Sequence, residues 1–204
     1  MTETQVWITR HTRAKLEGLV SINGICTKKC KFAKFCYSDR HMQYRRYVKE
    51  KFALNSEILD NRLLKADEIA ELNLHSETGC VRPFSFGNAN TDICLENVHK
   101  IAYQRGTNDF GIWITPDNLL KSQRLKWSSN AKIIYSNKEL DNAVAPFGGM
   151  STFNIFTNKP KMDSERMRLE EMGVEVVICG QKCKECLACY KEPQRVVAVL
   201  EALK

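Results

Sequence analysis

Six short apolar runs, each bounded by turn-forming residues, alternate along this chain with segments of helical periodicity. The runs predict strands at residues 19–22, 81–86, 111–115, 131–135, 152–156 and 174–178. Helical spacing between them predicts helices at residues 37–54, 56–72, 92–105, 117–126, 138–144 and 164–172. Because such alternation is typical of parallel strands joined by crossover helices, the sequence predicts an α/β fold.

The strand candidates are almost continuously apolar, as strands covered by helices on both faces are. Six strand–helix units fit either an open doubly wound sheet or a partial (β/α)6 barrel, and periodicity does not separate the two. We expect a single domain over residues 1–204, with the α/β body at 18–178, a cysteine-rich loop at 179–190 and a C-terminal helix within 191–204. In both architectures functional residues gather at the carboxyl ends of the strands.

Composition limits the class of protein. Hydrophobic residues make up 43% and charged residues 27% of the 204 residues, which are ordinary values for a globular chain. No run of eighteen apolar residues occurs, and the first fifteen residues lack the apolar core of a secretory signal, so we expect a cytoplasmic protein without a membrane partner. The formal net charge of +7 leaves nucleic acid or a nucleotide as a partner class.

Nine cysteines in a reducing compartment favour metal binding or redox chemistry over disulfides. Cys26, Cys30 and Cys36 place three thiolates within eleven residues, after the first predicted strand. Three ligands suit a four-iron cluster with one open iron, whereas a structural zinc site normally has four protein ligands. His41 could supply that fourth ligand, so zinc is an alternative here.

The second group of cysteines is denser still. It comprises Cys179, Cys183, Cys186 and Cys189, and four thiolates can close the coordination shell of a metal. The group therefore suits a second iron–sulfur cluster or a four-cysteine zinc site. A third possibility is that one of these cysteines completes the N-terminal cluster, if both groups lie at strand ends on the same rim.

The first cysteine group, with Phe35 directly before Cys36, resembles the radical S-adenosylmethionine superfamily. More narrowly, Cys36-Tyr37 followed by the basic segment 38–47, together with the cysteine-rich tail 183–189, is similar to the bacteriophage "gene 88 product" family of radical-SAM-like proteins. The resemblance spans roughly residues 18–190, with its specific motifs confined to the two cysteine groups. It implies a partial barrel of six parallel strands, with the cysteine groups at the C-terminal mouth of the strands.

The resemblance also implies roles for single residues. Cys26, Cys30 and Cys36 would ligate a [4Fe-4S] cluster, S-adenosylmethionine would chelate the fourth iron, and Phe35 would lie against its adenine. A reductant such as flavodoxin or ferredoxin would supply the electron that yields a 5′-deoxyadenosyl radical for hydrogen abstraction from a substrate.

Four more positions match cofactor contacts of that superfamily. Gly87 and Asn88 stand where its glycine-rich stretch meets the amino group of the cofactor, and Ser136 and Asn137 stand where a polar residue meets the ribose. Two departures from the pattern are visible. The last two cysteines of the N-terminal group are separated by five residues instead of two, and Asn88 replaces an acidic residue.

Two other interpretations use the same ligands. The chain could be a non-catalytic α/β module, stabilised by zinc or an iron–sulfur cluster, that binds nucleic acid or protein. It could also be a redox or metal sensor. Cys80 and Cys94, which lie outside both groups, are expected to be small buried hydrophobic residues.

Overall fold

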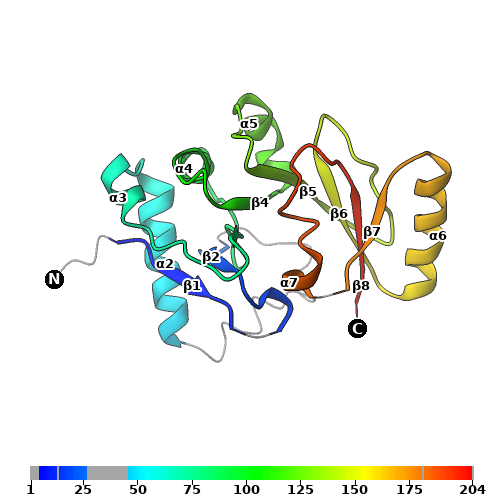
Figure 1. The fold of residues 1–204 in the computed structure, drawn as a ribbon, viewed down its shortest axis with the longest axis horizontal. Helices are drawn as coiled ribbons and strands as arrows, with labels where there is room; N and C mark the ends of the chain where they lie inside the picture. The colour runs from blue at the N-terminus through cyan, green and yellow to red at the C-terminus, as the bar shows by residue number, and fades with distance from the viewer. Residues whose placement is uncertain (1–4, 13, 27–45, 181, 204) are drawn as a thin grey trace.

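The computed structural model describes residues 5–12, 14–26, 46–180 and 182–203. One eight-stranded sheet runs through them in the order β1-β2-β3-β4-β5-β6-β8-β7 (Figure 1). The strands are β1 (Ile8–Arg10), β2 (Val20–Ile22), β3 (Cys80–Val81), β4 (Asp109–Ile114), β5 (Ala131–Leu140), β6 (Ser151–Phe156), β7 (Val176–Ile178) and β8 (Ala198–Ala202). All neighbouring pairs are parallel except β1 with β2, and β1 and β7 form the two edges. The predicted α/β class is confirmed as a mostly parallel sheet that does not close.

Helices cover one face of this sheet. They are α2 (Arg46–Asn61), α3 (Ala66–Ala70), α4 (Asp92–Gln104), α5 (Leu119–Arg124) and α6 (Lys159–Glu171). The chain also has the short helices η1 (Ala14–Leu16), η3 (Pro116–Asn118) and α7 (Cys183–Cys186), of which α7 lies on the opposite face. In Figure 1, α2, α3 and α4 lie beside the half of the sheet that contains β1 to β4, and α6 lies beside β7 and β8. Phe110, Ile112 and Ile114 of β4 pack into the main core on the helix side.

The opposite face, which we call the inner face, carries the alternate residues of the strands. Leu19 and Cys80 pack there with Tyr190, and Ile134 packs with Phe153. Trp113 of β4 joins both of these inner clusters, as period-two alternation along a strand requires. The described segment that covers this face contains the second cysteine group instead of a long helix.

The sheet is strongly curved around its inner face. Lys15 of η1, just before β2, bonds Glu201 of β8 with 2.6 Å between Nζ and Oε2. Five strand spacings separate β2 from β8, which is about 24 Å in a flat sheet at about 4.8 Å per strand. Two side chains do not bridge that distance, so the contact requires the sheet to bend.

Local sequence signals account for two of the helix starts. Thr91 caps α4 by accepting a hydrogen bond from the backbone N–H of Cys94 at 3.1 Å, as its position before residue 92 predicts. Helix α6 begins at Lys159, five residues before its predicted start, because Asn158 caps it and Pro160 fits the first turn.

Two predicted helices are wrong. The segment 138–144 starts as strand, because β5 continues to Leu140 across a register shift opposite β6. Residues 191–204 contain β8 instead of a helix, and β8 inserts between β6 and β7. Val197 and Val199 face the inner clusters while Ala198 and Leu200 face α6, so the apolar residues follow a period of two.

The predicted strand at 81–86 is shorter than expected. Only Cys80 and Val81 form β3, although the backbone N–H groups of Arg82 and Phe84 still donate to β2, to Val20 and Ile22. Phe84 then turns the chain away with a φ of +57°. The result is a loop at 82–90 that runs along the carboxyl end of β2.

Candidate functional site

The cysteine-rich loop crosses the inner face. It leaves the sheet at Cys179, whose backbone N–H donates to Leu200 of β8 at 2.8 Å. One helical turn, α7, carries Cys183 and Cys186, and Leu187 ends it in the left-handed region with a φ of +49°. The side chain of Tyr190, which follows, is buried and only 1% exposed. Figure 1 shows α7 between the β1–β2 side of the sheet and β8.

Gly111 of β4 lets this loop approach the sheet closely. A Cβ atom at this position would lie 2.5 Å from the carbonyl oxygen of Cys189 and 2.8 Å from the ring of Tyr190. Contacts this short are not tolerated by backbone or by a packed ring. Glycine is therefore required at position 111 for the loop to pack against β4, because any side chain there would displace Cys189.

The four cysteines of the loop are electrostatic neighbours. The pKa of Cys189 is raised to about 12, chiefly by burial; the charge of Arg82 opposes the shift, and the other three thiols of the group add to it. Burial also raises the pKa of Cys183, where Arg82 and Lys15 oppose the shift and Cys179 and Cys186 add to it. Without a bound cation, Cys183 and Cys189 are therefore protonated near neutral pH.

The donor chemistry of the loop fits a metal better than its present geometry does. Four thiols are a full ligand set for zinc or for an iron–sulfur cluster, and a cation would relieve the mutual repulsion of the thiolates. Within the described part of the chain, however, no three Cys, His, Asp or Glu side chains are already placed to hold one metal ion. A metal held by these four cysteines alone would therefore need the loop to rearrange.

Two cations of the inner face lie close to these cysteines. The Arg82 guanidinium stacks over the Trp113 ring, with its carbon 4.0 Å from the ring centroid. Lys15 lies 5.5 Å from the centroid of the Phe153 ring and bonds Glu201. Both positive charges act on the pKa of Cys183, so this side of the loop favours negative charge.

Two buried polar groups beside the loop have no hydrogen-bond partner among the described residues. They are the Tyr190 hydroxyl and the indole N–H of Trp113. Tyr190 also feels the charges of Cys183 and Cys189, and burial raises its pKa well above the usual range. Buried donors normally have acceptors, and the sulfurs of a metal centre are acceptors of this kind.

The resemblance implies that the second cysteine group lies at the carboxyl ends of the strands. In the structure the group is not gathered there. Lys184 of α7 forms ion pairs with Glu77 at 2.6 Å and with Glu17 at 3.8 Å, which precede β3 and β2. Lys191 pairs with Asp109, the first residue of β4. Only Cys179 lies at a carboxyl end, because the loop then runs along the inner face towards the amino ends.

The segment leading to Cys26 does lie at the carboxyl edge. Its backbone is held on two sides, because the Ile25 N–H donates to Ser56 of α2 at 2.9 Å and the Asn90 amide donates to the Ile25 carbonyl at 2.9 Å. Cys26 itself is exposed. The predicted ligands Cys30 and Cys36, and Phe35 between them, lie outside the described residues.

The structure brings Gly87 against the segment leading to Cys26. Gly87 has a φ of +85°, and a Cβ atom there would lie 2.2 Å from the carbonyl oxygen of Gly24. Only glycine satisfies both conditions. Its neighbour Asn88 is half-buried and donates a long 3.4 Å hydrogen bond to Thr115 at the end of β4. These two predicted site residues therefore border the carboxyl edge near Cys26.

Ser136 and Asn137 lie inside β5, not in a loop after it. Asn137 is 3% exposed, and its amide donates to the Asn142 carbonyl at 2.6 Å and to Asn154 at 3.1 Å. Its side-chain oxygen accepts from the backbone N–H of Glu139 at 3.0 Å. Asn137 therefore holds the end of β5 to β6 and has no donor left for a ribose.

Sequence reasoning missed the charged residues of the inner face. Arg82, Lys132 and Lys15 are placed among the inner-face clusters by tertiary contacts. A signal existed for two of them, because Arg82 and Lys132 interrupt apolar strand runs. Charged residues within such runs normally have a specific reason to be there. His11 is hydrogen-bonded to Ser21, with 2.7 Å between Nε2 and Oγ.

Cys80 and Cys94 are both buried, as expected. In the part of the chain that the structure describes, no helix is both long and apolar enough to cross a bilayer. Comparisons of the chain with protein-family models, with curated proteins and with solved structures found no match.

Proposed function

We propose that this chain is an iron–sulfur protein whose cysteine-rich loop holds a metal–sulfur centre on the inner face of the sheet. The observation that carries the proposal is the packing of one four-cysteine loop on the inner face: Cys179, Cys183 and Cys189 contact the two inner clusters, and Cys186 lies on α7 with Cys183. Burial and the neighbouring thiols raise the pKa of Cys183 and of Cys189, and a bound metal would replace the protons of these buried thiols.

The surroundings of the loop support an anionic centre. A metal held by four thiolates carries net negative charge, and Arg82 and Lys15 provide positive charge beside Cys183. The Tyr190 hydroxyl and the Trp113 indole N–H supply donors that no other described residue uses. Hydrogen bonds to cluster sulfurs and burial are the means by which proteins set the redox potential of such centres.

We further propose that Cys26, Cys30 and Cys36 hold a second, open cluster and that the protein is a radical S-adenosylmethionine-type enzyme. The curved sheet would then be a partial barrel, with this cluster at its carboxyl edge. When bound, such a cluster supplies the electron for reductive cleavage of S-adenosylmethionine. The residues of this chain that support the assignment are Gly87 and Asn88, which border the segment leading to Cys26.

A second candidate function is a structural metal module that binds nucleic acid or protein without catalysis. The packing of the loop favours it, because Tyr190 is buried and Cys189 packs into two inner clusters. A closed four-cysteine site in such a place resembles a structural zinc site more than a catalytic one. The formal net charge of +7 suits an anionic partner.

Metal analysis separates these candidates. The full chain is purified without oxygen, iron, sulfide and zinc are measured, and the reduced protein is studied by electron paramagnetic resonance with and without S-adenosylmethionine. About eight irons per chain, with a spectrum perturbed by the cofactor, would support two clusters and the enzyme. Stoichiometric zinc, with no effect of S-adenosylmethionine on the spectrum, would instead support the structural metal module and contradict the enzyme.

Variants assign each centre to its ligands. The double variant C183S/C186S is expected to lose the metal of the loop and to keep the response to S-adenosylmethionine, while C26S is expected to do the opposite. Cys94→Ala is the matched control, because it removes one buried thiol from α4, outside both groups. Full metal content in C183S/C186S would refute the centre on the inner face.

A further inference from the structure

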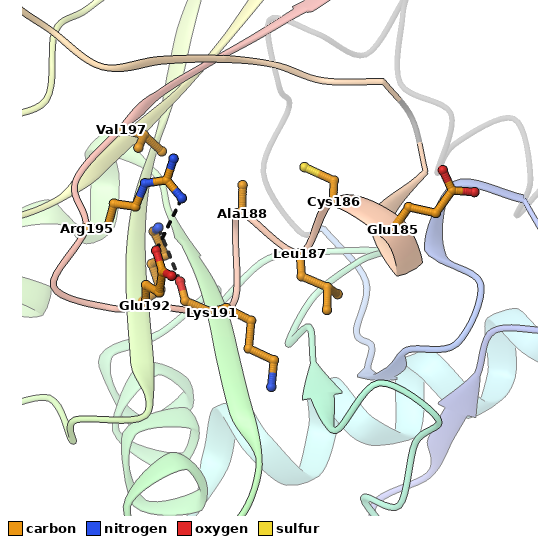
Figure 2. Close-up of a pocket in the computed structure, with 9 residues that line it drawn as sticks. Glu185, Cys186, Leu187, Ala188, Lys191, Glu192, Arg195 and Val197 are labelled. Carbon is orange, nitrogen blue, oxygen red and sulfur yellow. Dashed lines mark hydrogen bonds and ion pairs between the residues drawn. The ribbon is translucent and has the colours of Figure 1, made fainter.

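A separate pocket of about 160 Å³ lies between the cysteine-rich loop, strand β5 and the segment that enters β8. Its lining residues are Lys132, Glu185, Cys186, Leu187, Ala188, Lys191, Glu192, Arg195 and Val197. Figure 2 shows Cys186, Ala188, Glu192 and Arg195 around the space. The pocket is smaller than the roughly 300–1,000 Å³ typical of drug-sized ligands, so it suits a small ligand or one end group of a larger one.

Lys132 gives this pocket its chemical character. It is the second residue of β5 and is only 2% exposed. The hydrogen bond found for its ammonium within the described residues is a long one, 3.4 Å to the carbonyl oxygen of Lys191. An ammonium has three donors, and a buried one without a carboxylate is expensive to maintain. Burial accordingly lowers the pKa of Lys132, although the neighbouring Cys189 opposes this shift.

The other charges of the pocket wall are already paired. Arg195 bonds Glu192 at 3.2 Å and also bonds Glu175. Glu185 bonds Lys182 at 3.1 Å, and Lys191 bonds Asp109. Both carboxylates of the lining therefore have bonded partners other than Lys132, although Arg195 is shared between Glu192 and Glu175, and these two carboxylates act on the pKa of Lys132 from a distance. Among the ion pairs of the described residues, none includes Lys132, so its ammonium has no carboxylate in direct contact at the base of the pocket.

We propose that this pocket binds a phosphate-type oxyanion, free or as the end group of a small molecule, with the Lys132 ammonium as its principal contact. The charge is of the right sign, and the ammonium has donors to spare. The space accommodates several waters at about 30 Å³ each, which is enough for a tetrahedral oxyanion with part of its hydration. Exposed Cys186, Glu192 and Arg195 form the rim, so the anion enters directly from solvent.

This binding site does not depend on the metal centres proposed above. Cys186 contributes to the rim, but Lys132 and Val197 at the base belong to strand β5 and to the segment entering β8. An absence of metal binding would therefore not contradict the proposed anion site, and an absence of anion binding would not contradict the proposed metal centre.

Isothermal calorimetry with inorganic phosphate at constant ionic strength tests the proposal on the full chain. We expect saturable binding in the roughly millimolar range or tighter by the wild type. Lys132→Met keeps the length and apolar stem of the side chain and should weaken binding at least tenfold, because it removes the charged donor. Lys138→Met is the matched control: it lies on the same strand, pairs with Asp117 outside the pocket and should bind phosphate like the wild type.

Methyl phosphate distinguishes the two sources of the anion. Equal or tighter binding of methyl phosphate than of inorganic phosphate would indicate an esterified end group, and a preference for inorganic phosphate would indicate the free ion. If the wild type shows no saturable binding of either, or if Lys132→Met and Lys138→Met bind alike, the proposal is overturned. The wild-type titration keeps it testable even if Lys132→Met does not fold.

Discussion

Lys15 and Glu201 are 186 residues apart in sequence and form an ion pair of 2.6 Å across the inner face. Their side chains are 30% and 14% exposed, so both charges are largely removed from water. The pair connects the segment before β2 to β8, near the far edge of the sheet. It is therefore a direct tie between the two halves of the curved sheet.

Removing one partner of this pair should destabilise the protein. Lys15→Met or Glu201→Gln removes this ion pair from a largely buried position, which we expect to lower the free energy of unfolding by about 1–3 kcal/mol. Urea denaturation of both single variants and of the double variant measures the coupling. Arg46→Met, which breaks the exposed pair with Glu50, is the control and should cost less than about 0.5 kcal/mol. Equal losses in the two pairs would contradict the role of Lys15 in closing the inner face.

Substitution of Gly87 should disturb the segment that leads to Cys26. Gly87→Ala combines a positive φ with a Cβ atom 2.2 Å from the Gly24 carbonyl oxygen, and we expect a loss of about 3 kcal/mol or more. Gly79→Ala has a similar φ of +72° but nothing within 4 Å of the new Cβ, so it should cost only about 1 kcal/mol. Thermal unfolding compares the two. A similar cost for both would mean that the loop at 82–90 moves aside freely.

Substitution of Gly111 tests whether the cysteine-rich loop must pack closely against β4. Gly111→Ala places a methyl group against Cys189 and Tyr190, so the loop must lift from β4. We expect the metal content of the loop to fall by half or more while the fold of the sheet, followed by far-ultraviolet circular dichroism, persists. Gly106→Ala meets no atom within 4 Å and serves as the control. Unchanged metal content in Gly111→Ala would show that the loop does not need this close approach.

His11 should make stability depend on pH below neutrality. Burial, and secondarily the charge of Arg82, lower its pKa from 6.5 to about 4. Between those values the unfolded chain binds a proton that the native protein does not, so stability rises with pH. The contribution is about 3 kcal/mol, is fully present above about pH 6.5, and is lost as the pH falls to about 4.

Urea denaturation between pH 4 and pH 7.5 measures this dependence. His11→Gln should flatten the profile in that window, because glutamine does not titrate and can still bond Ser21. His75→Gln, at an exposed position, should leave the profile unchanged. A wild-type slope that survives in His11→Gln would assign the pH dependence to other groups.

Much of the α/β pattern could be read from local sequence. The apolar runs at β4 and β6 and the cap of α4 at Thr91 were predictable, because burial and capping act on neighbouring residues. The second helix boundary was less predictable. The sequence predicts a break between two helices at residue 55, but Asn55 lies inside α2. Its buried amide donates to the backbone carbonyls of Trp7 and Asn23, which are contacts between distant segments that local sequence does not reveal.

The cysteines of the candidate site were identified by their spacing, and their arrangement was not. Sequence indicated that Cys179, Cys183, Cys186 and Cys189 act together, since four such residues within eleven positions are rarely accidental. The sequence could not show that α7 lies near the amino ends of β2 and β3. That position depends on tertiary contacts, such as the ion pairs of Lys184 with Glu17 and Glu77.

The sequence by itself determined which segments are apolar enough to form strands and which residues can ligate a metal. The tertiary structure alone decided that residues 198–202 are a strand between β6 and β7, because strand pairing joins residues distant in sequence and a short valine-rich run fits either helix or strand. It also decided that Lys132 and Arg82 face the inner side of the sheet, because the curvature of the sheet and the path of the loop across it set which charges meet.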